Sequence, residues 1–354
     1  MDFTAPPCVQ AAIVEKTRHG IYGYFDTDRT YFQVLQGWFS TRFGFEIKPE
    51  WLVKTPGVVN AIHLALMAYT APGDGVIIQQ PVYYPFMMAI EKTGRKLVVN
   101  QLVRDDEGRY AINFEDFEDK ITTQKVKAFI LCSPHNPVGR VWTKEELKRL
   151  GQICARHGVT VISDEIHQDF VHRGHEHTVF SEADPDFGEI SIICTAATKT
   201  FNLPALPMAN IFIPNKKLRE KFVGEYQKFG VSQMGVMEVT AAQAAYKDGG
   251  PWLEALLDYL GGNIELIDSF LETRLPGVKF SKPQGSYLAW LDFSGFGLSP
   301  AELEDISLHK AKVWLSNGAI FGAGGEGFLR MNTASPRAVI ERALNQLEGA
   351  FGSL

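Results

Sequence analysis

The chain has 354 residues, of which 45% are hydrophobic and 21% charged, and this ordinary globular composition excludes wholesale disorder. Its 35 lysines and arginines against 41 acids give a net charge of −6. That balance argues against a protein that binds nucleic acids or anionic membranes, since binding to either needs a concentrated basic face.

The apolar runs are far shorter than the ~18 residues of a membrane span, and the first residues lack the features of a signal peptide. The four cysteines are scattered, without a C-x-x-C pair: Cys8, Cys132, Cys154 and Cys194. Two disulfides are conceivable, but isolated thiols in a reducing compartment are the simpler interpretation. We therefore expect a soluble cytoplasmic protein.

Strand-like apolar runs alternate with helical patterns through the middle of the chain, which is typical of βαβ units with parallel strands. One helix is expected to begin at residues 56–57 and to stop at 72–74. A second begins at the capping box of residues 143–146 and ends before Gly158. The expected strands are 76–79, 97–100, 126–132, 159–163, 190–194 and 211–214.

The last hundred residues have a different pattern. In order they predict a helix, a strand, a second helix, a glycine-rich turn and a helix after Pro336; the first three cover 252–273, 287–293 and 300–317. We therefore expect a large α/β domain at residues 25–250 and a smaller α+β domain made of 1–24 and 251–354, because the first twenty residues are too few for a unit of their own.

Polar residues follow three of the expected strands at their carboxyl ends, where open parallel sheets bind ligands. Asn136 follows the strand 126–132, Asp164 follows 159–163, and Lys199 follows 190–194. Free N–H groups at the helix beginning near Gly57 suit a phosphate. Together these features predict a pocket for an anionic cofactor that carries an aldehyde or another lysine-reactive group.

Each residue alone has an ordinary alternative. A lone lysine is usually a solvated charge, a strand-end aspartate a helix cap, and Asn-Pro or a lone glycine a turn. Their occurrence together and in this order favours the site.

Four segments carry a resemblance to a known family: PVYYPF at 81–86, CSPHNPVGRVW at 132–142, SDEIHQD at 163–169 and KTFN at 199–202. They resemble pyridoxal-phosphate enzymes of the class I/II aminotransferase fold (fold type I), and within it the C–S β-lyase branch of cystathionine β-lyases and maltose-regulon-modulator-like proteins. The resemblance runs from residues 19–24 to 328–332. It implies a seven-stranded, mostly parallel sheet between helices, a smaller α+β domain, and a homodimer with shared active sites.

The resemblance also implies roles for single residues. Lys199 would form the Schiff base with pyridoxal 5'-phosphate and then remove the substrate Cα proton. Asp164 would keep the pyridine nitrogen protonated, so that the ring can accept electrons. Tyr83 would stack on the ring, Asn136 would bind the 3-oxygen, and Arg330 would clamp the substrate carboxylate.

For the phosphate, the resemblance implies the amides of Gly57, Val58 and Val59, with Tyr24 reaching over from the neighbouring subunit. Tyr24 could instead belong to a local aromatic cluster, and Tyr83 could be a core tyrosine. His167, three residues after Asp164, would lie near the 3-oxygen, but a core histidine is an equal alternative.

Two departures from the family pattern affect these expectations. Relatives usually carry some tens of residues before the segment that resembles the start of this chain, and those preceding residues contribute small-domain structure and part of the active-site wall. Their absence, whether from a misplaced start codon or a natural truncation, puts substrate selectivity and stability in doubt but not the cofactor chemistry. Aminotransferases often place a serine and an arginine where this chain has Ala196 and Pro207, which leaves Thr198 as the nearest hydroxyl. The second departure leans away from a standard transaminase.

The short histidine cluster His172, His175 and His177 lacks the spacing of a standard zinc site, so we expect a solvated loop and no metal.

The leading functional hypothesis is β-elimination from an S-substituted cysteine, with an amino-acid aminotransferase as the alternative. A regulatory protein that retains the fold is the third possibility, and a dehydrogenase is disfavoured because no G-x-G-x-x-G follows an early strand. The sequence does not identify the thiol part of the substrate.

Overall fold

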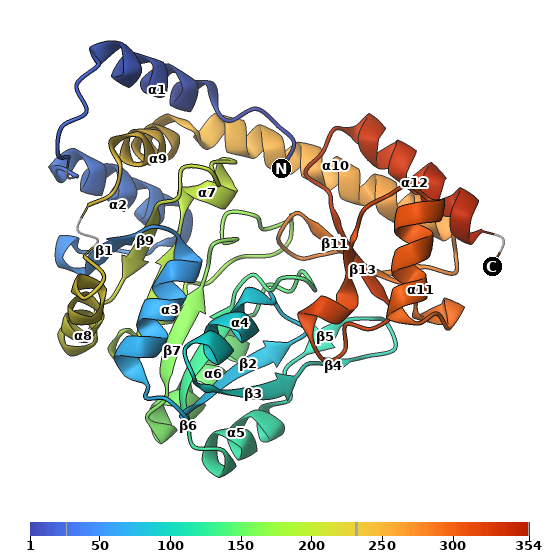
Figure 1. Ribbon diagram of the computed structural model, residues 1–354, viewed down its shortest axis with the longest axis horizontal. Helices are drawn as coiled ribbons and strands as arrows, with labels where there is room; N and C mark the ends of the chain where they lie inside the picture. Colours follow the sequence, from blue (N-terminus) through green and yellow to red (C-terminus); the bar gives the residue numbers. More distant parts are fainter. Residues whose placement is uncertain (26, 231–232, 353) are drawn as a thin grey trace.

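A computed structural model describes residues 1–25, 27–230, 233–352 and 354 (Figure 1). Seven strands of this described part form the main sheet, in the order β1-β9-β8-β7-β6-β2-β3. Their bounds are β1 Leu52–Thr55, β2 Gly75–Gln80, β3 Lys96–Gln101, β6 Val126–Cys132, β7 Thr160–Asp164, β8 Ser191–Thr195 and β9 Ala209–Phe212. Strands β3, β2, β6, β7 and β8 are parallel, whereas β9 runs antiparallel to both β8 and β1. The predicted fold class is confirmed.

Helices cover both faces of this sheet, which explains why β2, β8 and β9 are buried along their whole length. In β2, Val76 and Ile78 face one layer while Ile77 faces the other. The first layer contains α3 Val58–Tyr69, α4 Pro85–Lys92 and α8 Lys216–Gln227. The second contains α2 Arg29–Phe43, α5 Phe114–Thr123, α6 Lys144–His157 and α9 Val236–Asp248.

Local signals place the ends of two helices as predicted. The Thr143 hydroxyl accepts a hydrogen bond from the Glu146 backbone N–H at 3.1 Å, and the Glu146 carboxylate accepts one from the Thr143 N–H at 2.8 Å. Helix α6 then ends at Gly158, whose φ of +64° suits glycine. Helix α3 begins directly after Gly57.

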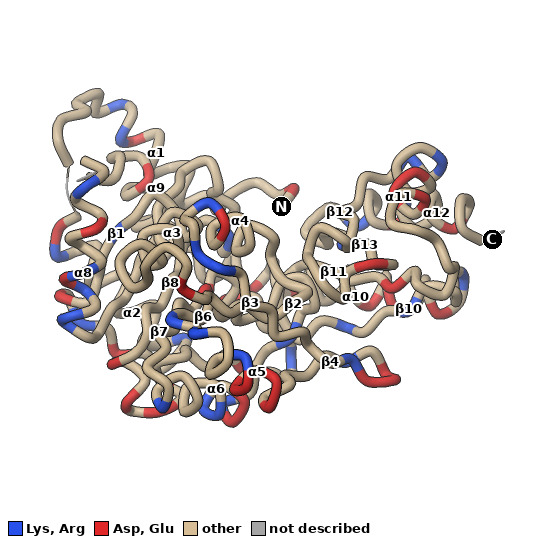
Figure 2. Tube along the Cα trace, turned by 60° about the horizontal axis from the view of Figure 1, so that its bottom comes forward, with Lys and Arg blue, Asp and Glu red and all other residues tan. Residues whose placement is uncertain are grey.

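The small domain stands beside the large one (Figure 2). Its antiparallel sheet has the order β10-β11-β13-β12 and packs against helices that are apolar on one side. The bounds are α10 Gly250–Arg274, β10 Lys279–Phe280, β11 Leu288–Asp292, α11 Pro300–Asp305, β12 Ser316–Asn317, β13 Phe328–Asn332 and α12 Arg337–Phe351. Shorter elements elsewhere are β4 Val103–Arg104, β5 Tyr110–Ala111 and α7 Ala197–Thr200.

The helix predicted at 300–317 is too long. Helix α11 ends at Asp305 and is followed by a π-helical turn at 306–310. Lys312 then adopts a left-handed φ of +58°, and the Asn317 side chain accepts a hydrogen bond from the Ala319 N–H at 3.0 Å. The helical hydrogen-bond pattern cannot continue through a left-handed residue. The apolar periodicity in the sequence continues past this point, and the predicted helix was therefore too long.

The first residues divide between the two domains. Helix α1 Pro7–His19 packs on α9 of the large domain, whereas the Asp2 N–H donates to the Ala334 carbonyl at 2.8 Å and the Phe3 ring lies 5.5 Å from that of Tyr259. We expected residues 1–24 to pack with the small domain. The structure agrees for the first residues, but α1 packs on the large domain. No helix of the described ranges is both long and apolar enough to cross a membrane.

Candidate active site

Three parallel strands bring Asn136, Asp164 and Lys199 to one edge of the main sheet. Cys132, the last residue of β6, is in register with Asp164 at the end of β7, and Asp164 is in register with Cys194 of β8. The segments after these strands therefore leave the sheet on the same side, as the sequence predicted.

Asp164 is a buried carboxyl, with only 5% of its surface exposed. Burial raises the pKa of Asp164 to about 7; the Ile166 N–H, which donates to Oδ1 at 3.1 Å, and the charge of Lys199 oppose this shift. The hydrogen bond and the Lys199 charge therefore do not fully offset the cost of burying the ionised carboxylate. A protonated ring nitrogen placed beside it would supply the missing positive charge.

Lys199 is half-buried on the short helix α7. Burial, together with the charge of Arg330, lowers the pKa of the Lys199 amine, while Asp164 acts in the opposite direction. Lowering the pKa increases the neutral fraction of the amine, and the neutral amine is the form that attacks an aldehyde or accepts a proton.

Arg330, on β13 of the small domain, reaches across to the strand ends of the large domain. Its Nη1 donates to Asn136 Oδ1 at 2.9 Å and its Nη2 to Ser316 Oγ at 3.2 Å, and its guanidinium lies 4.7 Å from the centre of the Phe321 ring. Burial lowers the pKa of Arg330, and no carboxylate of a described residue pairs with it. A fixed guanidinium without an acidic partner suits a substrate carboxylate.

Tyr83 and Tyr287 lie close to this group. Tyr83 is half-buried, and burial and the Asp164 charge raise its pKa. Tyr287 is buried, and burial raises its pKa although the charge of Arg330 opposes this. Sequence reasoning predicted Tyr83 but missed Tyr287, whose only signal was an aromatic residue at the start of a predicted strand.

His167 is 5% exposed and packs against the rings of Phe170 and Tyr287. Burial and the charges of Lys199 and Arg330 lower the pKa of His167 to about 3, so the ring is neutral at physiological pH. His167 is thus buried as a core histidine would be, and its place near the cofactor's 3-oxygen stays a prediction.

The predicted phosphate site is the start of α3. Gly57 has a φ of +98°, a conformation for glycine, and a Cβ there would meet nothing within 4 Å. Val58 is buried, Val59 is exposed, and the helix directs its first N–H groups toward this open space. The fifth predicted residue near the phosphate, Thr198, is buried beside Lys199.

These side chains form a donor set that fits pyridoxal 5'-phosphate. A buried carboxyl suits the ring nitrogen, an amide and a neutral imidazole suit the ring oxygen, and a helix start suits the phosphate. Tyr24 is the exception within a single chain, because its side chain is fully exposed.

The prediction of a solvated histidine loop is wrong for two of its three members. His177 is buried, and its Nε2 lies 2.8 Å from Oε2 of the buried Glu165. His172 is partly buried and donates to the Ser286 carbonyl at 2.8 Å, whereas His175 is exposed. Spacing alone did not show that Glu165, directly after Asp164, would bring one imidazole inside. No group of three or more metal-binding side chains occurs in the described part of the chain.

A second set of polar contacts, which the sequence did not predict, holds the helix that carries Lys199. The hydroxyl of Thr200 donates to Asp169 Oδ2 at 2.7 Å, and Arg42 Nε of α2 lies 3.1 Å from Asp169 Oδ1. Asp169 therefore joins the segment after Asp164 to the helix that carries Lys199.

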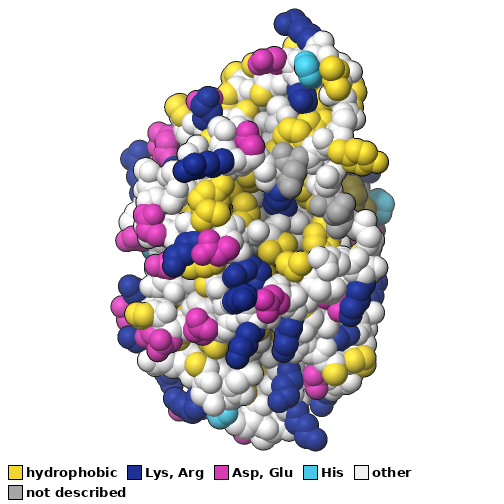
Figure 3. Space-filling model, turned by 90° about the vertical axis from the view of Figure 1, so that its left-hand side faces the viewer, with side chains coloured by type: hydrophobic (Ala, Val, Ile, Leu, Met, Phe, Trp, Pro, Cys, Tyr) yellow, Lys and Arg dark blue, Asp and Glu magenta, His cyan; other side chains and the backbone are white. Residues whose placement is uncertain are grey.

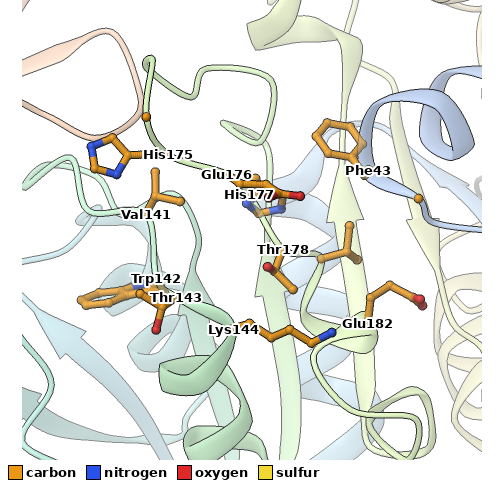
Figure 4. Close-up of a pocket in the computed structure, with 13 residues that line it drawn as sticks. Phe43, Val141, Trp142, Thr143, Lys144, His175, Glu176, His177, Thr178 and Glu182 are labelled. Carbon is orange, nitrogen blue, oxygen red and sulfur yellow. The ribbon is translucent and has the colours of Figure 1, made fainter.

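A cavity of about 550 Å³ lies apart from this group, between α2, the start of α6 and the loop at 174–179 (Figure 4). Phe43, Trp142, Lys144, His177 and Glu182 are among its lining residues. None of the residues predicted to hold the cofactor lines it.

Comparisons with known proteins identify the family. The model of the aminotransferase class I and II family matches residues 2–347. Cystathionine beta-lyase PatB of Bacillus subtilis (strain 168) is 45% identical over 351 residues, which cover 99% of this chain and 90% of that protein. Protein MalY of Escherichia coli (strain K12) is 33% identical over 353 residues, 99% of this chain and 90% of that protein.

Among solved structures, cystalysin from Treponema denticola, which contains a pyridoxal 5'-phosphate cofactor, matches with a TM-score of 0.97 and 35% identity. The match covers 100% of this chain and 89% of that one. The family resemblance drawn from the four sequence motifs is thereby confirmed, and the chain belongs to the aminotransferase class I and II family.

Proposed function

We propose that this protein is a pyridoxal 5'-phosphate-dependent C–S lyase that acts on an S-substituted cysteine such as cystathionine and gives a thiol, pyruvate and ammonia. The observation that carries the proposal is the group of Lys199, Asp164, Asn136 and Arg330 at one strand edge, in a chain 45% identical to a cystathionine β-lyase over nearly its whole length. The cofactor, when bound, supplies the ring that accepts the electron pair left at Cα.

The side chains divide the remaining work. Arg330 and Asn136 are hydrogen-bonded to each other; Arg330 would hold the substrate carboxylate, and Asn136 would hold the cofactor's 3-oxygen. Asp164 would hold the proton on the cofactor's ring nitrogen. The Lys199 amine takes the proton from Cα as the Cβ–S bond breaks and the thiolate leaves, and water then converts the released aminoacrylate into pyruvate and ammonia.

The test is the product formed from cystathionine with and without a keto-acid acceptor. We expect pyruvate and free thiol in equal amounts, without dependence on the acceptor. Turnover that strictly requires the acceptor would instead assign an aminotransferase, because that reaction returns the proton to the cofactor. Cofactor binding without either reaction would favour the regulatory alternative.

We also propose that two copies share their active sites through Tyr24. Supporting this, the segment around Tyr24 exposes Ile21, Tyr22 and Tyr24 with 66%, 56% and 100% of their surface, although large apolar side chains are normally buried. On the face that carries α1 and α8, apolar side chains lie among charges of both signs (Figure 3). A second copy that covers this segment would place the Tyr24 hydroxyl at its partner's phosphate.

Two experiments with variants of Tyr24 test the shared site. Tyr24→Phe should weaken cofactor binding by about 1–2 kcal/mol, a typical loss for one hydrogen bond to a charged group. If Tyr24→Ala and Lys199→Ala are each inactive, exchange of subunits should restore partial activity, since one site of the mixed dimer contains both native residues. No recovery after proven exchange, or an active monomer by light scattering, would contradict the shared site.

The free thiols of Cys8, Cys132, Cys154 and Cys194 support a cytoplasmic location, where a reducing pool keeps them unpaired.

We also propose a division into a large domain of residues 25–250 and a small domain of 1–24 and 251–354, although α1 lies on the large domain. Limited proteolysis near residue 250 tests that boundary.

A further inference from the structure

Ser286 has an unusual backbone for a serine. Its φ is +71°, in the left-handed region that residues with a side chain rarely adopt, and the residue is fully buried. Such a conformation persists only where neighbouring contacts hold it, and it occurs often at functional sites.

Three hydrogen bonds hold Ser286 against the segment that follows Asp164. The Ser286 N–H donates to the Phe170 carbonyl at 2.7 Å, and the Ser286 carbonyl accepts from His172 Nε2 at 2.8 Å. Its Oγ lies 3.2 Å from His167 Nδ1. Backbone and side chain of one small-domain residue are thus fixed to one large-domain loop.

Two glycines allow this close approach between the domains. A Cβ on Gly285 would lie 2.8 Å from the Phe170 carbonyl, and a Cβ on Gly139, where φ is +73°, would lie 2.5 Å from Pro283 Cβ. The N–H of Gly285 donates to the Gly139 carbonyl at 3.0 Å. The segment that carries Ser286 is therefore seated on loops after both β6 and β7.

The other nitrogen of the His167 ring is in a different situation. Among the described residues Nε2 has no hydrogen-bond partner, and it is not one of the polar atoms sealed from solvent. The ring lies close enough to Lys199 and Arg330 for their charges to act on it. Nε2 therefore keeps its hydrogen-bonding capacity for a group that binds near Lys199 and Arg330.

We propose that Ser286 is a positioning residue whose hydroxyl donates to His167 Nδ1 and thereby keeps the remaining imidazole proton on Nε2, directed toward the cofactor's ring oxygen. A neutral imidazole has a single N–H, so a donor at Nδ1 selects the tautomer protonated at Nε2. That tautomer can donate to an anionic ring oxygen, whereas the other would present a lone pair to it. The inference rests on the proposed cofactor, and it assigns a role to a small-domain residue that does not itself touch that cofactor.

Two variants separate the hydroxyl from the backbone. Ser286→Ala removes the hydroxyl and keeps the unfavourable left-handed conformation, whereas Ser286→Gly removes the hydroxyl and relieves it. Ser281→Ala, five residues upstream, is the matched control, because its hydroxyl bonds the Glu107 carbonyl at the surface.

The first readout is the tautomer of His167, from ¹⁵N-histidine NMR of the cofactor-free protein, with His167→Gln to assign the signal. We expect one tautomer, protonated at Nε2, in the wild type and in Ser281→Ala, and a mixture in both Ser286 variants. The second readout is the cofactor dissociation constant, which should rise about tenfold in both Ser286 variants.

An effect in Ser286→Ala that is absent from Ser286→Gly would overturn the proposal, because the backbone and not the hydroxyl would be responsible. A wild type with mixed tautomers, or wild-type tautomer and affinity in both variants, would overturn it as well. Neither readout uses cystathionine, so failure of the lyase assay leaves this test intact.

Discussion

Replacing Lys199 with alanine is expected to abolish the covalent attachment of pyridoxal 5'-phosphate and to lower turnover about 1,000-fold or more, the range for loss of a general base. The expectation follows from its position beside Asp164 and from the lowered pKa of its amine, which favours the reactive neutral form. Among the described residues, Lys199 is the lysine whose charge acts on Asp164. The measurements are the rate of pyruvate formation and the absorbance band of the lysine-bound cofactor.

Lys199→Arg is the matched control, because it keeps a positive charge near Asp164 but stays protonated and cannot form the covalent link. The Lys199→Arg protein should be as inactive as Lys199→Ala, but it should still bind the cofactor non-covalently through its phosphate. Borohydride reduction of the wild type fixes the cofactor to its lysine, and peptide mapping identifies that residue. A modified peptide without Lys199 would remove it from its assigned role.

The part of the site that sequence reasoning predicted best is the part that depends on local order. Asn136, Asp164 and Lys199 each follow a buried strand within a few residues, and parallel strands must deliver such residues to one edge. The helix limits at Gly57, Thr143 and Gly158 were predicted for the same reason, since caps act within one turn.

Contacts between distant segments were not predictable in this way. The bond between Arg330 and Asn136 joins residues 194 positions apart, and Arg330 was found only through the family resemblance. Ser286 and Tyr287 gave no motif, because their role depends on how the small domain sits on the loop after β7. His177 appeared solvated because nothing local shows that the buried carboxylate of Glu165 is its partner.

Asp164→Asn is expected to have opposite effects on the protein with and without cofactor. Without cofactor, burial raises the pKa of Asp164 from its ordinary value near 3.8 to about 7. Between these two pH values the folded state keeps a proton that the unfolded state releases, so the unfolded state binds fewer protons. Stability of the wild type therefore falls as pH rises through this window, by up to about 1.4 kcal/mol per pH unit.

An asparagine does not ionise and can still accept the hydrogen bond from the Ile166 N–H. Cofactor-free Asp164→Asn should therefore be more stable than the cofactor-free wild type at pH 8, and the difference should shrink toward zero near pH 4. With cofactor the order should reverse, because the amide cannot hold the ring-nitrogen proton, and turnover should fall by several orders of magnitude.

Calorimetric melting of both proteins at pH 5 and pH 8, with and without pyridoxal 5'-phosphate, measures the stability effects, and the rate of pyruvate formation measures the loss of turnover. Asp292→Asn is the control, because Asp292 is also buried but its Oδ2 lies 2.7 Å from Arg104 Nη1. Removing one partner of a buried ion pair should destabilise that variant with or without cofactor. A cofactor-free Asp164→Asn protein that melts below the wild type at pH 8 would contradict the raised pKa of Asp164. A variant that retains the wild-type gain in melting temperature on cofactor binding would show that Asp164 does not face the ring nitrogen. The reversal of order is the decisive observation, since a carboxylate with a purely structural role would lower or raise stability equally in both states.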